Sequence, residues 1–357
     1  MEANVAKAGG PLRACGSPAP LLFEDMLRRD HAALPEIDVY VCGFPCQPFS
    51  RLNNKSRMFK EANARPFYAM LATLRARLPA LGVLENVVGI YRVLDKVWRH
   101  LRKLGWYDVY ILTLDPAHMG EPVSRPRAYF VLVRVDVAVP ESDGVAARMA
   151  RLGMTSSRDP LADRVLTSRG APWQAVAATQ GPRPPASPQG SKPRLWHALH
   201  KGRPHARLCA PALVLTCREE GVLRIRLAEA GLGQLSASTN IDVSQSVTRT
   251  RLRPLCPTVT PNARIVIGAQ GRLMTPIEKC LVHLVPVDEL HWPASLTDRD
   301  VARLGGNTMH LKAVGKALLF GIALVDWGSP SAQRRPPAAA KPPRTPAKPR
   351  RVLVSAA

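Results

Sequence analysis

A short apolar run that leads into a proline-bounded loop is the feature that most restricts the fold of this chain. Residues 39–42 read Val-Tyr-Val-Cys, and Gly43-Phe44-Pro45-Cys46-Gln47-Pro48-Phe49-Ser50 follows. The apolar run predicts a strand, and the prolines on both sides of Cys46 fix φ and remove backbone donors. Cys42 lies within the strand, but Cys46 lies beyond its end, where ligands bind in α/β sheets. Cys46 is therefore a candidate nucleophile, although a lone cysteine in a turn is more often a small apolar residue.

A second apolar run, residues 81–84, leads into Glu85-Asn86-Val87. Between the two runs, apolar residues at helical spacing precede a proline: Phe67, Met70, Leu71, Leu74 and Leu78, then Pro79. The order strand, helix, strand predicts a right-handed βαβ unit with both strand ends on one edge of a parallel sheet. Cys46 and Glu85 could then face one pocket, where a carboxyl group suits general acid work. A helix cap or a surface position is the ordinary alternative for Glu85.

Two arginines, Arg125 and Arg127, precede a third apolar run at residues 128–133. Guanidinium groups two residues apart can hold a phosphate or a base edge. An ordinary solvated basic turn is the alternative.

Together these segments resemble the cytosine-C5 DNA methyltransferase family. Pro45-Cys46-Gln47 matches the family's nucleophile loop, Glu85-Asn86-Val87 its Glu-Asn-Val motif, and residues 123–127 its Gln-x-Arg-x-Arg motif, with Val123 in place of the glutamine. Residues 272–278 and 305–309 resemble two later motifs, the second opening a helix that continues through Ala313, Ala317 and Phe320. The motifs keep the family's order and cover about residues 20–135 and 245–327.

The resemblance implies methyl transfer from S-adenosylmethionine to C5 of cytosine in double-stranded DNA through a covalent adduct of Cys46. Glu85 would bind N3 and the exocyclic amine of cytosine, Arg127 its carbonyl oxygen, and Arg125 would support the pocket. The target base would have to be flipped out of the duplex.

The cofactor side of this resemblance is incomplete. The family's opening Phe-x-Gly-x-Gly loop, which follows its first strand, has no counterpart in this sequence. The expected fold is therefore an α/β, Rossmann-like methyltransferase sheet that is N-terminally incomplete, with a smaller irregular target-recognition domain. The family's cofactor contacts that remain are Asp25, Pro45 and Asn307, and Asp25 could equally be a helix-start acid. A second polypeptide supplying the first strands would restore activity.

The sequence suggests five regions. They are an N-terminal extension (1–19), the first part of the catalytic domain (20–138), a target-recognition domain (139–255), the closing part of the catalytic domain (256–327) and a disordered basic tail (328–357). From Ser329 the tail holds seven basic residues, seven prolines and no acid. It could direct nuclear import, tether DNA or only be solvated.

The charge and cysteine content agree with an intracellular, nuclear enzyme that acts on nucleic acid. The formal net charge is +23, which favours polyanionic partners. Seven cysteines without a paired framework suit a reducing compartment. Zinc binding near Cys209 and Cys217 is disfavoured because no C-x2-C spacing occurs, so no metal site is expected. No signal peptide and no membrane-spanning apolar run is recognised.

Three alternatives stay open at this stage. One is a tRNA cytosine-C5 methyltransferase, the second is a catalytically inactive DNA-binding relative, and the third is a truncated gene product.

Overall fold

A computed structural model describes residues 25–46, 49, 59, 62–140, 144–145, 215–236, 238–287, 289–290, 292–293, 295–333 and 350–352. The described residues form two compact units. The first holds those up to Met119, from Pro126 to 145 and from Lys312 onward; the second holds 120–125 and 215–311. Most of the expected recognition domain, 139–255, lies outside the described residues, and the expected closing part, 256–327, is divided between the units at Leu311 and Lys312.

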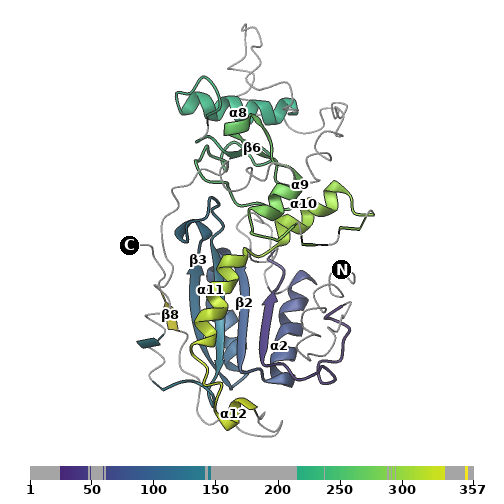
Figure 1. Cartoon of the computed structure of the whole chain (residues 1–357), viewed down its shortest axis with the longest axis vertical. Helices are drawn as coiled ribbons and strands as arrows, with labels where there is room; N and C mark the ends of the chain where they lie inside the picture. The colour runs from purple at the N-terminus through teal and green to yellow at the C-terminus, as the bar shows by residue number, and fades with distance from the viewer. Residues whose placement is uncertain are drawn as a thin grey trace. The chain divides into compact units, whose positions relative to one another are not determined.

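A five-stranded mixed sheet forms the centre of the first unit (Figure 1). Its order is β1 (Val39–Gly43), β2 (Leu81–Val87), β4 (Arg127–Arg134), β3 (Tyr107–Leu114) and β8 (Arg350–Val352). β1 runs parallel to β2, and β3 runs parallel to β8, whereas β4 is antiparallel to both β2 and β3. The start of β4 therefore lies at the same edge of the sheet as the carboxyl ends of β1 and β2.

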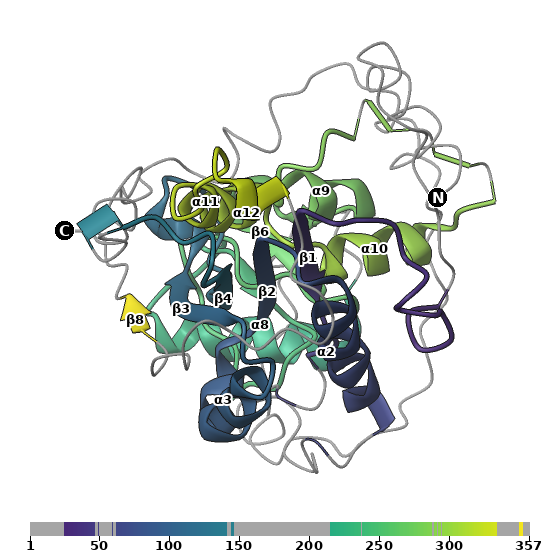
Figure 2. The same ribbon diagram turned by 90° about the horizontal axis from the view of Figure 1, so that it is seen from below.

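Helices cover both faces of this sheet (Figure 2). α2 (Arg65–Arg77) and α3 (Leu94–Arg102) pack on one face through a core that includes Phe67, Leu74, Val97 and Leu101. α11 (Leu311–Ile322) packs on the other face through Ala313, Ala317 and Phe320. The layering is that of a Rossmann-like α/β fold, as the sequence predicts.

The predicted βαβ unit is present as β1, α2 and β2. α2 ends where Leu78 adopts a left-handed conformation, with φ of 42°, just before Pro79. β2 is longer than its apolar run, because Glu85, Asn86 and Val87 continue its pairing with β4. Among the described strands β1 pairs only with β2, and the side chains of Val39 and Val41 are 37% and 40% exposed. β1 is thus an apolar edge strand in the described part of the sheet.

The second unit is built on α8 (Cys217–Glu229) and a small antiparallel sheet of β5 (Ile241–Asp242), β6 (Ile265–Ile267) and β7 (Arg272–Leu273). α9 (Pro276–Leu281) and α10 (Asp298–Asn307) complete it. α8, α9 and α10 each begin with a capping box, in which the side chains of Thr216, Thr275 and Thr297 accept a backbone N–H three residues ahead.

Short helical turns join the larger elements. They are η2 (Ala62–Ala64), η3 (Val88–Val93), η4 (Pro116–His118), η5 (Gly268–Gln270) and the four-residue α12 (Pro330–Gln333). In the part of the chain that the structure describes, no helix is both long and apolar enough to cross a bilayer.

Candidate active site

The Cys46 loop is anchored on both sides by buried aromatic rings. Phe44 and Phe49 are 4% and 0% exposed, and their rings meet edge to face with centroids 5.9 Å apart. The backbone N–H of Phe49 donates to the carbonyl of Cys46 at 2.9 Å, which closes a turn around the cysteine. Cys46 itself is only partly buried. The loop therefore presents a thiol at the carboxyl end of β1, while Gln47 and Pro48 lie outside the described residues.

Two polar side chains fix the same loop from η3 and β2. Asn86 is fully buried; its Nδ2 donates to the carbonyl of Phe44 at 3.1 Å, and its Oδ1 accepts the N–H of Val87 at 2.9 Å. Arg92 donates from Nη2 to the carbonyl of Phe49 at 3.1 Å. These bonds tie the residues on either side of Cys46 to the end of β2. No sequence pattern marks Arg92 for this role, and the only signal for Asn86 is its position directly after Glu85.

Glu85 and Arg127 form an ion pair at this edge of the sheet. Arg127 Nε lies 2.9 Å from Glu85 Oε1, and the two side chains are only 12% and 13% exposed. The strand register explains the pair, because Gly43 lies opposite Glu85 on β1 while Val87 lies opposite Arg127 on β4. Two of the four residues proposed from the sequence as catalytic are thus in direct contact, next to the strand that leads to Cys46.

The two cysteines near this edge differ in their surroundings. Cys42 lies within β1, and burial raises the pKa of its thiol, an effect that the nearby Tyr40 hydroxyl and Arg29 only partly oppose. A thiol with a raised pKa is a poor nucleophile, since the thiolate is the reactive form. Of these two cysteines, the geometry therefore favours Cys46 for nucleophilic chemistry.

Arg125 is placed in the second unit, where it braces backbone rather than projecting as a surface cation. It is 5% exposed, and its guanidinium donates to the carbonyls of Val259 at 2.6 Å, Gly306 at 3.1 Å and Thr308 at 2.9 Å. These bonds grip the chain on both sides of Asn307. Arg125 and Asn307 are thus held in one substructure.

Asn307 ends α10 rather than opening the next helix, which corrects the expectation from the sequence; α11 begins at Leu311. The glycine before it permits a close approach, because a Cβ on Gly306 would meet the nitrogen of Pro261 at 2.2 Å. The exposed Asn307 side chain is therefore displayed at a tightly packed helix end.

The other candidate cofactor residues, Asp25 and Pro45, belong to the first unit. Asp25 is exposed; its Oδ1 accepts the N–H of Leu27 at 2.8 Å, and its Oδ2 lies 3.6 Å from Arg28 Nε. These are the contacts of an acid that starts a turn, one of the two roles expected for it. Pro45 follows Phe44 at the end of β1.

The late motif at residues 272–278 has a local structural role. Arg272 binds Glu278 through two hydrogen bonds, Nη1 to Oε2 at 2.8 Å and Nη2 to Oε1 at 2.6 Å, and Glu278 also closes the capping box of α9 with Thr275. Within the described residues, no three His, Cys, Asp or Glu side chains are grouped as metal ligands.

Comparison with known proteins identifies a family that the segment with the Cys46 loop and the Glu85–Arg127 pair resembles. The sequence model for C-5 cytosine-specific DNA methylases matches residues 19–160. Residues 19–160 therefore resemble a C-5 cytosine-specific DNA methylase domain. The matched segment includes Cys46, Glu85, Arg125 and Arg127.

Curated relatives are similar to part of the chain. The type II methyltransferase M.NlaX of Neisseria lactamica is 34% identical over 112 residues, covering 30% of this chain and 35% of the relative. The type II methyltransferase M.HaeII of Haemophilus aegyptius is 34% identical over 117 residues, covering 30% and 35%. The chain thus spans about a third of the length of these relatives.

Among solved structures, the Dnmt2 methyltransferase of S. pombe is 15% identical with a TM-score of 0.44, covering 82% of each chain. A prophage-encoded DNA modification methyltransferase from E. coli is 18% identical with a TM-score of 0.43, covering 81% of this chain and 79% of that one.

Proposed function

We propose that the protein transfers a methyl group from S-adenosylmethionine to C5 of cytosine in DNA through a covalent adduct of Cys46. The observation that carries the proposal is the partly buried Cys46, held at the end of β1 next to the 2.9 Å Glu85–Arg127 ion pair. The match of residues 19–160, which include all three side chains, to the C-5 cytosine-specific DNA methylase model supports the same reaction.

The proposed chemistry assigns one task to each of the three side chains. The Cys46 thiolate adds to C6 of cytosine, and the electrons of the C5–C6 double bond make C5 nucleophilic. Glu85 binds N3 and the exocyclic amine, which favours this addition, and Arg127 binds the carbonyl oxygen of the base while its ion pair orients the Glu85 carboxylate. After methylation, removal of the C5 proton re-forms the double bond and expels Cys46.

The described residues fit S-adenosylmethionine in part. Asp25 offers an exposed carboxylate that could accept the adenine amine, and Pro45 lies at the strand end where ligands bind. Asn307 offers an exposed amide in the second unit. A glycine-rich turn, which would let a cofactor approach the backbone, is not found among the described residues. When bound, the cofactor supplies an electrophilic methyl group.

We also propose that a second polypeptide extends the sheet beyond β1. Val39 and Val41 leave an exposed apolar face on this strand, and β1 has β2 as its only partner among the described strands. An unpaired edge offers backbone donors and acceptors for a further strand. Strands added in this way would lie next to β1 and the Cys46 loop.

Double-stranded DNA remains the proposed substrate, and residues 139–255 its proposed recognition domain. The curated relatives described above are type II methyltransferases, which favours DNA over the tRNA alternative. These relatives do not support the expected nuclear location, since both come from bacteria.

The cysteine assignment can be tested without the cofactor. Addition of Cys46 to C6 makes the C5 proton exchangeable, so the chain should catalyse deuterium exchange at cytosine C5 of a duplex in D2O, measured by mass spectrometry. We expect Cys46→Ser to abolish exchange, Cys42→Ser to retain it, and Glu85→Gln to slow it by roughly two orders of magnitude.

A second readout uses the cofactor. A duplex that carries 5-fluorocytosine should trap the protein covalently when S-adenosylmethionine is present, because fluorine cannot leave as a proton does. Exchange or trapping that persists in Cys46→Ser would overturn the assignment. Folded protein that shows neither reaction, with or without a partner, would favour the inactive DNA-binding alternative.

A further inference from the structure

α3 carries a basic face that the proposed reaction does not use. Lys96, Arg99, His100 and Lys103 lie at spacings of three and four residues, which places them on one side of the helix. The opposite side is buried in the core through Val97 and Leu101. The lysines and Arg99 are exposed, and His100 is half-buried. These four residues are named the α3 basic face.

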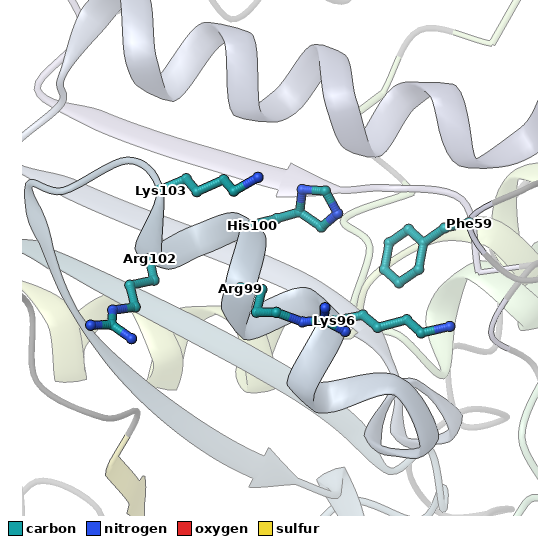
Figure 3. A pocket seen from close by; sticks show the side chains of 6 residues that line it. All are labelled: Phe59, Lys96, Arg99, His100, Arg102 and Lys103. Atoms are coloured by element: carbon teal, nitrogen blue, oxygen red, sulfur yellow. The ribbon is translucent and has the colours of Figure 1, made fainter.

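This face borders a hollow of about 660 Å³ lined by Phe59, Lys96, Arg99, His100, Arg102 and Lys103 (Figure 3). Aromatic rings support it from below: His100 packs against Phe59, Phe67 and Tyr68 with ring centroids 5.4 to 5.8 Å apart. Of the basic residues at the hollow, His100 is thus packed on three rings, whereas Arg102 points away from the others in Figure 3.

Among the described residues, the cations of the hollow have no carboxylate partner. None of the ion pairs formed among the described residues includes Lys96, Arg99, Arg102 or Lys103. The carboxylate nearest in sequence, Asp95, is exposed, and only its backbone carbonyl is approached by Arg99 Nε, at 3.4 Å.

We propose that the α3 basic face binds the phosphate backbone of the DNA substrate outside the catalytic site. The inference rests on the proposed function only in taking the bound polyanion to be DNA. Lys96 and Lys103 are separated by about 10 Å along the helix. The cations therefore form a row that can contact several phosphates along one DNA strand rather than a single phosphate. The concave shape of the hollow suits a chain of phosphates better than a flat membrane surface. Membrane binding would also need apolar groups able to insert into the bilayer, whereas the aromatic rings here pack against one another.

The surroundings of His100 give this site a pH dependence. Partial burial, together with Lys103 and Arg99, lowers the pKa of His100, so the free protein holds a neutral imidazole at neutral pH. The Tyr68 ring on α2 also packs against His100. A phosphate bound nearby would favour the imidazolium form and raise the pKa, so binding takes up a proton. Affinity should therefore increase as the pH falls from about 8 to about 6.

The test removes three charges and compares the salt dependence of DNA binding. Lys96→Gln, Arg99→Gln and Lys103→Gln are combined in one variant. The control variant combines Arg75→Gln, Arg299→Gln and Arg303→Gln, which are exposed arginines on α2 and α10. Binding of a labelled duplex of about 30 bp, three helical turns, is followed by fluorescence anisotropy over a range of salt concentrations.

We expect the α3 variant to reduce the slope of log K against log salt by about 2 to 3, since each phosphate contact contributes about 0.9. Its affinity at low salt should fall at least about tenfold. The control should change the slope by less than about 1. His100→Gln should remove the pH dependence of binding and leave most of the salt dependence.

Several results would overturn the inference. They are an unchanged slope in the α3 variant, an equal change in the control, tight binding to phosphatidylserine vesicles with no binding to DNA, and wild-type protein that binds no duplex. Cytosine C5 exchange at saturating DNA separates this inference from the proposed function. If the protein catalyses exchange but the salt slope of the α3 variant is unchanged, only the inference about the α3 basic face is wrong. If the slope falls in the α3 variant but no exchange occurs, only the proposed reaction is wrong.

Discussion

At the scale of single residues, Asn86 uses both of its side-chain polar atoms within the protein. Its bonds to Phe44 and Val87 hold the start of the Cys46 loop against β2. Replacing it with alanine leaves the buried carbonyl of Phe44 without this donor, which costs about 1–3 kcal/mol of stability. A displacement of about 1 Å in a nucleophile can also cost about a hundredfold in rate.

We therefore expect Asn86→Ala to slow cytosine C5 exchange by about 10- to 100-fold while its KM for duplex DNA changes little, because phosphate contacts dominate affinity. Leu112→Ala is the control: Leu112 is fully buried in the core on the α11 side of the sheet and should lose about 2–5 kcal/mol of stability with an almost unchanged rate. If the two variants lose exchange rate equally, measured well below their melting temperatures, Asn86 only stabilises the protein and does not position the Cys46 loop.

The sequence predicted residue positions better than residue partners. Cys46, Glu85 and Arg127 could be proposed because Cys46 and Glu85 follow apolar runs and Arg127 directly precedes one, and the limits of strands are readable from local pattern. The bonds of Arg125 to Val259, Gly306 and Thr308 could not be foreseen, because those carbonyls lie more than 130 residues away in the chain. Hydrogen bonds to distant backbone leave no periodic signal.

At the scale of secondary structure, β1 and β2 provide a matched pair for testing the open edge. Val41 and Val83 are register partners on adjacent strands, yet Val41 is 40% exposed and Val83 is fully buried. Val41→Lys should change the free energy of unfolding by less than about 0.5 kcal/mol, as surface substitutions do, whereas Val83→Lys should cost more than about 4 kcal/mol by burying an unpaired charge.

Val41→Lys should also reduce self-association, since a charge on an edge strand opposes strand addition. Urea titration and light scattering measure the two effects. If Val41→Lys destabilises the protein by several kcal/mol, another segment of the chain covers β1, and the proposed second polypeptide loses its support.

The same elements show where local pattern is informative. The long apolar strands β1, β2 and β4 and the helix α2 were predicted because each has enough residues to show a period. The strands β5, β6 and β7 have only two or three residues each, too few to show alternation. Asn307 was placed at the wrong end of a helix because the helix end depends on close packing of Gly306 against Thr260 and Pro261, and such packing is not visible in a window of sequence.

At the scale of the whole molecule, the features that suit DNA outnumber those that suit the cofactor. The net charge is +23, the α3 basic face is without ion-pair partners among the described residues, and Cys46, Glu85 and Arg127 lie at one edge of the sheet. For S-adenosylmethionine the described residues offer Asp25, Pro45 and Asn307, with Asp25 already engaged by Leu27 and Arg28.

We therefore expect the purified 357-residue chain to bind duplex DNA with strong salt dependence but to bind S-adenosylmethionine only weakly, with a dissociation constant well above about 100 μM. Such an affinity corresponds to roughly 5 kcal/mol or less, as few contacts would supply. Isothermal titration calorimetry with the cofactor and anisotropy with the duplex measure the two affinities on the same sample. Micromolar cofactor binding, or steady methylation of DNA by the unaided chain, would show that the residues of this chain complete the cofactor site by themselves and that β1 needs no second polypeptide.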